Sequence, residues 1–344
     1  MLRRIIRRRL GIALLITLAL VSASQGRQEA QRQNSALDLP LLSDDDKAEL
    51  SEAVRLQKAL GDQVWPGLGR ASIPIILYND RYEFLTGTTD PPAPWAVVEG
   101  DDFNGEKYYR RNVTNPQAFA VQVGGRWAGS MSTLGRMNRK SPLKLSRDFH
   151  VVAVLHEMFH AYQASQSPER FNQATKVYAA QARYPFKETE FAAAWDREGY
   201  LLATALKTTD DAGIRRAVRD FLQVRDARRA RAALSADLLA YERELEWLEG
   251  LAKYIEIRFY ELASSRGGDS AYSSYRPGLP YWQTNFVLLE RQLARQGGDL
   301  RFYLSGLAQA RLLDGLSPDW KAKVMRSGVY LEDILRTSVG RDAK

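Results

Sequence analysis

Residues 146–163 read SRDFHVVAVLHEMFHAYQ, and they predict a helix at the centre of the fold. Ser146 can cap the start of a helix, and Asp148 in the first turn suits the positive end of the helix dipole. The positions that follow are apolar on nearly every side. Because a helix that is apolar all round is normally buried, we expect this one to lie inside the protein.

The segments before this helix have the pattern of a sheet. The apolar run Ile73–Leu77 is typical of a strand. Phe119–Val123 and Trp127–Met131 alternate apolar with polar or small side chains, and Gly124-Gly125 separates them, which predicts a β-hairpin. We therefore expect a small, mostly antiparallel sheet over residues 70–135.

Helices predominate after the sheet region. One further helix is expected before it, at 43–60, capped by Ser43 and ended by Gly61. The later helices are expected at 186–207, 211–231, 236–264, 282–296 and 317–337. A sheet followed by helices indicates the α+β class. The helix at 211–231 carries seven Arg, which we interpret as a solvated basic face.

The central helix contains the pattern H-E-x-x-H at His156, Glu157 and His160. Residues four apart share a helical face, so the two imidazoles can chelate one Zn²⁺, with Glu157 beside them to polarise a water. The chain has only three His, and two of them occupy this pattern. The alternative is a metal-free helix with two hydrogen-bonded His, which would be expensive to bury without a partner.

A catalytic zinc site needs a third protein ligand. The remaining histidine, His150, lies off the face of the pair, so a downstream acid is required. Glu249 borders an apolar helical stripe beside the small residues Gly250 and Ala252, which would allow this helix to approach the His156 helix. Other interpretations stay open: Glu246 or Glu198 as the ligand, or a solvated acidic face that includes Glu249.

These residues resemble the gluzincin zinc metallopeptidases, through HEMFHAYQ at 156–163 and EGLAKY at 249–254. The resemblance implies a zincin-like helical domain with His156, His160 and Glu249 as zinc ligands and Glu157 as general base. In some gluzincins an Asp follows the ligand Glu by four residues, whereas this chain has Lys253 there. From the pattern along the chain we expect an N-terminal helix and β-sheet subdomain at 43–135 and a helical zinc-binding catalytic subdomain at 136–344.

The implied activity is hydrolysis of peptide bonds. Glu157 would take a proton from a zinc-activated water and deliver it to the leaving amine. Tyr281 is the favoured oxyanion donor, with Tyr254 and His150 as alternatives. The hairpin could bind an extended peptide substrate by strand addition. The alternative function is a catalytically silent protein that binds a metal or a peptide and retains the metallopeptidase fold.

The N-terminus points to export. Residues 1–10 contain five Arg and no acid, and 11–23 are nearly all apolar, which predicts a signal peptide at 1–23 followed by a flexible leader at 24–42. Its removal lowers the net charge from +8 to about +3, so nucleic-acid binding loses its compositional support. A periplasmic or secreted protein without a membrane span is expected, and an uncleaved signal anchor is the lesser possibility.

Composition excludes several further classes. The chain of 344 residues contains no Cys, which rules out thiol catalysis, disulfides, iron–sulfur clusters and zinc fingers. Because two of the three His belong to the zinc pattern, a Ser/His/Asp arrangement is not expected.

Overall fold

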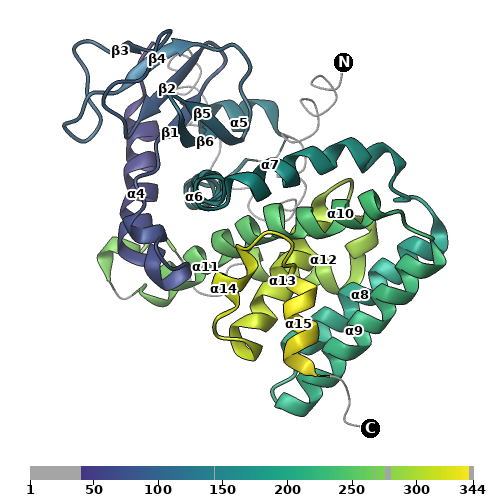
Figure 1. The fold of residues 1–344 in the computed structure, drawn as a ribbon. Helices are drawn as coiled ribbons and strands as arrows, with labels where there is room; N and C mark the ends of the chain where they lie inside the picture. The colour runs from purple at the N-terminus through teal and green to yellow at the C-terminus, as the bar shows by residue number, and fades with distance from the viewer. Residues whose placement is uncertain (1–39, 143, 268, 276–279, 341–344) are drawn as a thin grey trace. The chain divides into compact units, whose positions relative to one another are not determined.

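The computed structural model describes residues 40–142, 144–267, 269–275 and 280–340 (Figure 1). The predicted signal peptide and most of the leader lie outside these residues. Internal contacts divide the chain into two compact units. Within the described residues, the sheet unit comprises 40–165 and 255–275, and the helical unit comprises 166–254 and 280–340.

The sheet unit begins with helix α4 (Asp44–Val64). Ser43 caps it as predicted, because its hydroxyl accepts from the backbone of Asp46 while the Asp46 carboxylate accepts from the backbone of Ser43. The predicted end at Gly61 is wrong by one turn. A Cβ at Gly61 would lie 2.6 Å from the backbone nitrogen of Gly69. Gly61 therefore allows a close backbone contact and does not end the helix.

Six strands form one sheet, in the order β3-β4-β2-β1-β6-β5. Their bounds are β1 Ile75–Tyr78, β2 Tyr82–Thr86, β3 Ala96–Val97, β4 Tyr109–Asn112, β5 Phe119–Val123 and β6 Arg126–Ser132. The hairpin predicted around Gly124-Gly125 is confirmed as β5–β6, and both glycines have the positive φ that such a turn requires. The sheet is mixed rather than mostly antiparallel, because β1 and β6, separated by a long connection, pair in parallel.

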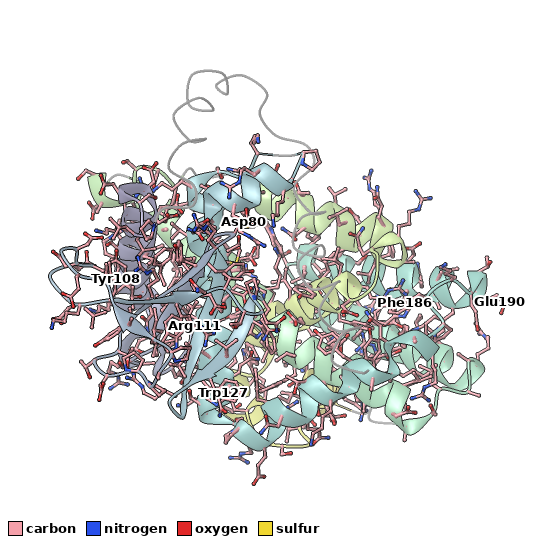
Figure 2. The ribbon with its side chains drawn as sticks, turned by 90° about the horizontal axis from the view of Figure 1, so that it is seen from above. Asp80, Tyr108, Arg111, Trp127, Phe186 and Glu190 are labelled. Atoms are coloured by element: carbon pink, nitrogen blue, oxygen red, sulfur yellow. The ribbon has the colours of Figure 1, made fainter. Side chains whose placement is uncertain are left out.

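Helices α5 (Leu134–Lys140) and α6 (Arg147–Gln166) follow the sheet. Asp80, after β1, accepts from Arg136 and Arg139 of α5 at 2.8 and 2.9 Å and holds this helix at the sheet (Figure 2). The helix α6 is the buried helix that the sequence predicts. Strand β6 packs directly on it, since a Cβ at Gly129 would lie 2.7 Å from the backbone nitrogen of Met158.

The helical unit contains most of the remaining helices. They are α7 (Pro168–Lys176), η3 (Val177–Arg183), α8 (Thr189–Lys207), α9 (Asp211–Arg231), α10 (Ala236–Leu245), η4 (Glu246–Gly250), α12 (Pro280–Gln292), η6 (Leu293–Arg295), α13 (Leu300–Leu316), α14 (Trp320–Val324) and α15 (Leu331–Val339). Figure 1 shows α8 and α9 side by side. The run continues from η4 into α11 (Leu251–Ser265), which passes into the sheet unit after Tyr254. Two short helices, η2 (Leu68–Arg70) and η5 (Ser270–Tyr272), also belong to the sheet unit.

The environment of the basic helix α9 differs from the predicted solvated face. Arg225, Arg228 and Arg229 are buried. Their guanidinium groups pair at 2.5–3.0 Å with glutamates from four other elements: Glu198 on α8, Glu242 on α10, Glu246 on η4 and Glu332 on α15. The prediction was wrong for these three residues because acids distant in sequence neutralise them inside the unit.

The α+β class is confirmed. Internal contacts place α6 in the same unit as the sheet. The subdomain boundaries 43–135 and 136–344 stay a prediction. In the part of the chain that the structure describes, no helix is both long enough and apolar enough to cross a membrane.

Candidate metal centre

His156 and His160 lie one turn apart on α6, and each side chain is 1% exposed. Their ring centroids are 4.8 Å apart. The spacing of four residues therefore places the two imidazoles on one face of a buried helix, as the sequence predicts.

A hydrogen bond at Nδ1 orients each ring. His156 Nδ1 lies 3.1 Å from a carboxylate oxygen of Glu256 on α11, and His160 Nδ1 lies 3.0 Å from the amide oxygen of Gln163. With Nδ1 as the donor in each case, Nε2 carries the lone pair that a metal requires.

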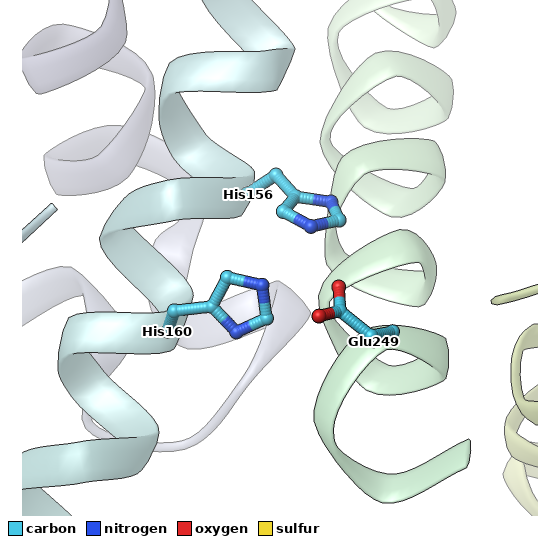
Figure 3. Close-up of side chains that lie close together, drawn as sticks. All are labelled: His156, His160 and Glu249. Carbon is cyan, nitrogen blue, oxygen red and sulfur yellow. The ribbon is translucent and has the colours of Figure 1, made fainter. Parts of the chain in front are cut away.

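Glu249 joins this pair. It belongs to η4, a π-helical turn within the continuous helical run 236–265. Glu256, the partner of His156, follows Glu249 by seven residues, or about two turns, on that run. One ligand atom from each of His156, His160 and Glu249 can be chosen so that all lie within 4.8 Å of one another, and the three side chains point toward a common centre (Figure 3).

Contacts inside the helical unit fix the position of Glu249. The Tyr178 hydroxyl donates to Glu249 Oε1 at 2.8 Å. A Cβ at Gly250 would lie 2.6 Å from the Cα of Gly306, so the backbone of η4 packs directly on α13. The close approach that Gly250 permits is thus to α13, whereas the sequence analysis assigned it to the His156 helix.

The alternative acids have other partners. Glu246 pairs with Arg225 at 2.6 Å and accepts from the Ser305 hydroxyl at 2.6 Å. Glu198 pairs with Arg225 and Arg228 and is fully buried among them. These contacts place both carboxylates in the arginine network, whereas Glu249 belongs to the group of possible metal ligands.

Glu157, the expected general base, is buried and directly follows His156. Its carbonyl group faces strand β6, because a Cβ at Gly129 would lie 2.8 Å from the Glu157 carbonyl carbon and oxygen. Phe119, the first residue of edge strand β5, has its ring centroid 4.8 Å from that of His160. The edge of the sheet therefore begins beside the metal motif.

The proposed oxyanion donors differ in their surroundings. Tyr254 donates to the Asp314 carboxylate at 2.9 Å. His150 is buried, with Nδ1 2.7 Å from the Glu49 carboxylate and Nε2 2.7 Å from the Ser132 carbonyl oxygen. Both are thus held by other groups. Tyr281 is the second residue of α12, and its side chain lies outside what the structure describes, so its role stays a prediction.

Sequence reasoning missed three supporting residues: Glu256, Gln163 and Tyr178. Gln163 follows His160 by three residues, and Glu256 follows Glu249 by seven, so helical spacing alone could have suggested both. No local signal connects Tyr178 with Glu249, because they are 71 positions apart and meet only in the folded helical unit.

No relative was found. A scan against protein-family models gave no match, and neither did searches of curated proteins and of solved structures.

Proposed function

We propose that this protein is a zinc-dependent hydrolase, a peptidase of the gluzincin type. The observation that carries the proposal is the group formed by His156, His160 and Glu249, whose ligand atoms lie within 4.8 Å of one another. Glu157, a carboxylate suited to proton transfer, is adjacent to this group in sequence.

The donor set fits zinc. Two imidazoles and one carboxylate match a catalytic site with three protein ligands and an open position. Zinc holds such donors at about 2.0–2.2 Å. A zinc ion held there would supply Lewis acidity toward water and toward a substrate carbonyl.

The protein's own groups would perform the remaining steps. Glu157 would accept a proton from the attacking water and then donate it to the leaving amine. Glu256 and Gln163 would keep the imidazoles in the orientation that ligation needs. Tyr281 remains the candidate for stabilising the oxyanion.

The proposed substrate is a peptide or protein. Strand β5 is an edge of the sheet, and its first residue, Phe119, contacts His160. An extended peptide that paired with β5 would bring its backbone to the metal motif. We also propose export through the signal peptide at 1–23, so that the N-terminus of the mature protein would be Ser24.

Two variants test the enzyme proposal. The purified wild-type protein is expected to contain one zinc per chain, and His156→Ala is expected to lose it. Glu157→Gln should retain zinc and lose cleavage of a peptide library by at least about 100-fold, the scale of general acid–base catalysis. Cleavage is measured by mass spectrometry, and zinc by elemental analysis.

The outcomes separate the alternatives. Zinc without cleavage across a broad library would indicate a silent metal-binding protein. A wild-type protein that neither contains nor takes up zinc would contradict both forms of the proposal. Cleavage by Glu157→Gln at the wild-type rate would show that another residue is the base.

A further inference from the structure

The helical unit contains a cavity of about 870 Å³ that the proposed hydrolysis does not use. Its walls come from η3 with the loop that leads to α8, and from η6 with the loop that leads to α13. Its volume lies in the range of small-molecule sites. The lining is mostly apolar and includes the aromatic side chains of Tyr178, Tyr184 and Phe186.

Arg301 lines this cavity and has incomplete hydrogen bonding. Its side chain is 2% exposed, and Nη2 donates to the Ala294 carbonyl oxygen at 2.9 Å. Neither Nε nor Nη1 has a hydrogen-bond partner among the residues that the structure describes. Burial lowers the pKa of this guanidinium, yet Arg retains its charge in proteins. A buried charged donor without an acceptor is costly, so two donors here lack the group that would satisfy them.

Positive charge predominates around the cavity. Lys187 and Arg295 line it and are exposed, whereas Glu188 is the acidic side chain in the lining. The Arg301 guanidinium carbon lies 4.8 Å from the Phe186 ring centroid, so this half-buried ring, labelled in Figure 2, covers the cation. Such a site favours a ligand that combines one anionic group with an apolar body.

We propose that this cavity binds an organic carboxylate with an aromatic or aliphatic body, and that the guanidinium of Arg301, in which Nε and Nη1 lack acceptors, receives the carboxylate. Two guanidinium donors that lie side by side, Nη1 with Nη2 or Nε with Nη2, match the two oxygens of a carboxylate. The Phe186 ring would shift from the guanidinium and pack against the apolar body of the ligand. Two sources share this chemistry: the C-terminal residue of a peptide and a free carboxylic acid.

Calorimetric titration of the full mature protein tests the site. The probes are N-acetylphenylalanine as a peptide-end mimic, 3-phenylpropanoate as a free acid, and the uncharged N-acetylphenylalaninamide. At least one of the two acids is expected to bind the wild type. Where N-acetylphenylalanine binds, its amide is expected to bind at least about tenfold more weakly. The acid that binds more tightly identifies the source.

Arg301→Gln should weaken binding of the acids by at least about tenfold, because a hydrogen bond to a charged group contributes roughly 1.5–3 kcal/mol. Arg291→Gln, which removes an exposed arginine of α12, is the matched control and should bind as the wild type does. The titration is repeated in His156→Ala. A carboxylate bound at the proposed zinc site would lose its affinity there, while one bound in the cavity would keep it.

The proposal is overturned if neither acid binds, if the amide binds as tightly as N-acetylphenylalanine, or if Arg301→Gln binds as the wild type does. Loss of acid binding in His156→Ala would also overturn it. If Arg301→Gln fails to fold, the difference in affinity between N-acetylphenylalanine and its amide on the wild type still tests whether the site requires a carboxylate. Because binding is measured without turnover, failure here is distinguishable from failure of the proposed hydrolysis.

Discussion

Glu256 is the residue on which the orientation of His156 depends. Its carboxylate lies 3.1 Å from His156 Nδ1, and both side chains are buried. We expect Glu256→Leu to lower zinc affinity by about 10–100-fold, because Nδ1–H loses its acceptor. Glu256→Gln should fall between this variant and the wild type, since an amide oxygen still accepts but carries no charge. Competition with a chromophoric chelator measures the affinity.

Glu261→Gln is the matched control on the same helix. Glu261 is partly exposed and pairs with Arg258 three residues before it, so zinc affinity should stay at the wild-type value. Wild-type affinity in Glu256→Leu would show that the hydrogen bond does not orient a metal ligand.

Residues close in sequence were the predictable part of the site. The spacing of His156 and His160 places them together on any helix, and the apolar stripe beside Glu249 favoured that acid over Glu246. The partners of these residues were harder to predict. The Tyr178 hydroxyl reaches the Glu249 carboxylate only after segments 71 positions apart have packed.

At the scale of elements, strand β6 packs directly on helix α6 at Glu157 and Met158. Gly129→Ala would place a methyl group 2.7 Å from the backbone nitrogen of Met158, so strand and helix must move apart. We expect this overpacking to destabilise the protein by about 1–3 kcal/mol. Displacement of Glu157 should also lower peptide cleavage. Chemical denaturation and the library assay measure the two effects.

The control is Gly315→Ala, at a glycine near the end of α13. Apart from the backbone of its own helix and its chain neighbours, no atom of the described residues lies within 4 Å of a Cβ there. We expect little loss of stability, because Ala favours helix more than Gly does. Stability equal to the wild type in Gly129→Ala would mean that β6 can move away without cost.

Helices and strands with strong local sequence signals were easier to predict than those without. Gly124-Gly125 marked the hairpin because its turn needs positive φ. The helix α13 was missed, since nearly all its residues are buried and its sequence has little contrast between faces. At Gly61 the same residue type indicated a helix end, whereas the structure uses it for a close backbone contact.

At the scale of the whole molecule, the α+β class could be predicted from the sequence, but the environment of the charged side chains could not. A run of arginines on α9 does not reveal by itself whether it faces water. The acids that neutralise Arg225, Arg228 and Arg229 come from four elements spread over residues 198–332. Local pattern therefore gave the wrong environment for the most highly charged helix of the helical unit.

This network makes the stability of the helical unit sensitive to acid. Burial alone would raise the pKa of Glu242, but Arg228 and Arg229 lower it to about 2, and Arg229 and Arg225 lower the pKa of Glu332 well below its usual value. A carboxylate whose pKa is depressed by folding stabilises the folded state above its unfolded pKa, about 4.5, and this contribution disappears as the pH falls toward 2. We expect the protection of amides in α8, α9, α10 and α15 against hydrogen exchange, expressed relative to the intrinsic rate at each pH, to stay constant from pH 7 to 5 and to fall below pH 4.5.

Removing one member of the network should produce the same loss at neutral pH. Arg225→Met leaves Glu198, Glu246 and Glu332 short of a cation, and breaking a buried pair in this way costs about 3–5 kcal/mol. Arg216→Gln, at an exposed position of the same helix, should change the free energy of unfolding by less than about 0.5 kcal/mol. Denaturant titration at pH 7 compares the two variants. Equal stability of Arg225→Met and Arg216→Gln would mean that the buried charges contribute no net stability, because the hydrophobic side chain then replaces the ion pairs without cost.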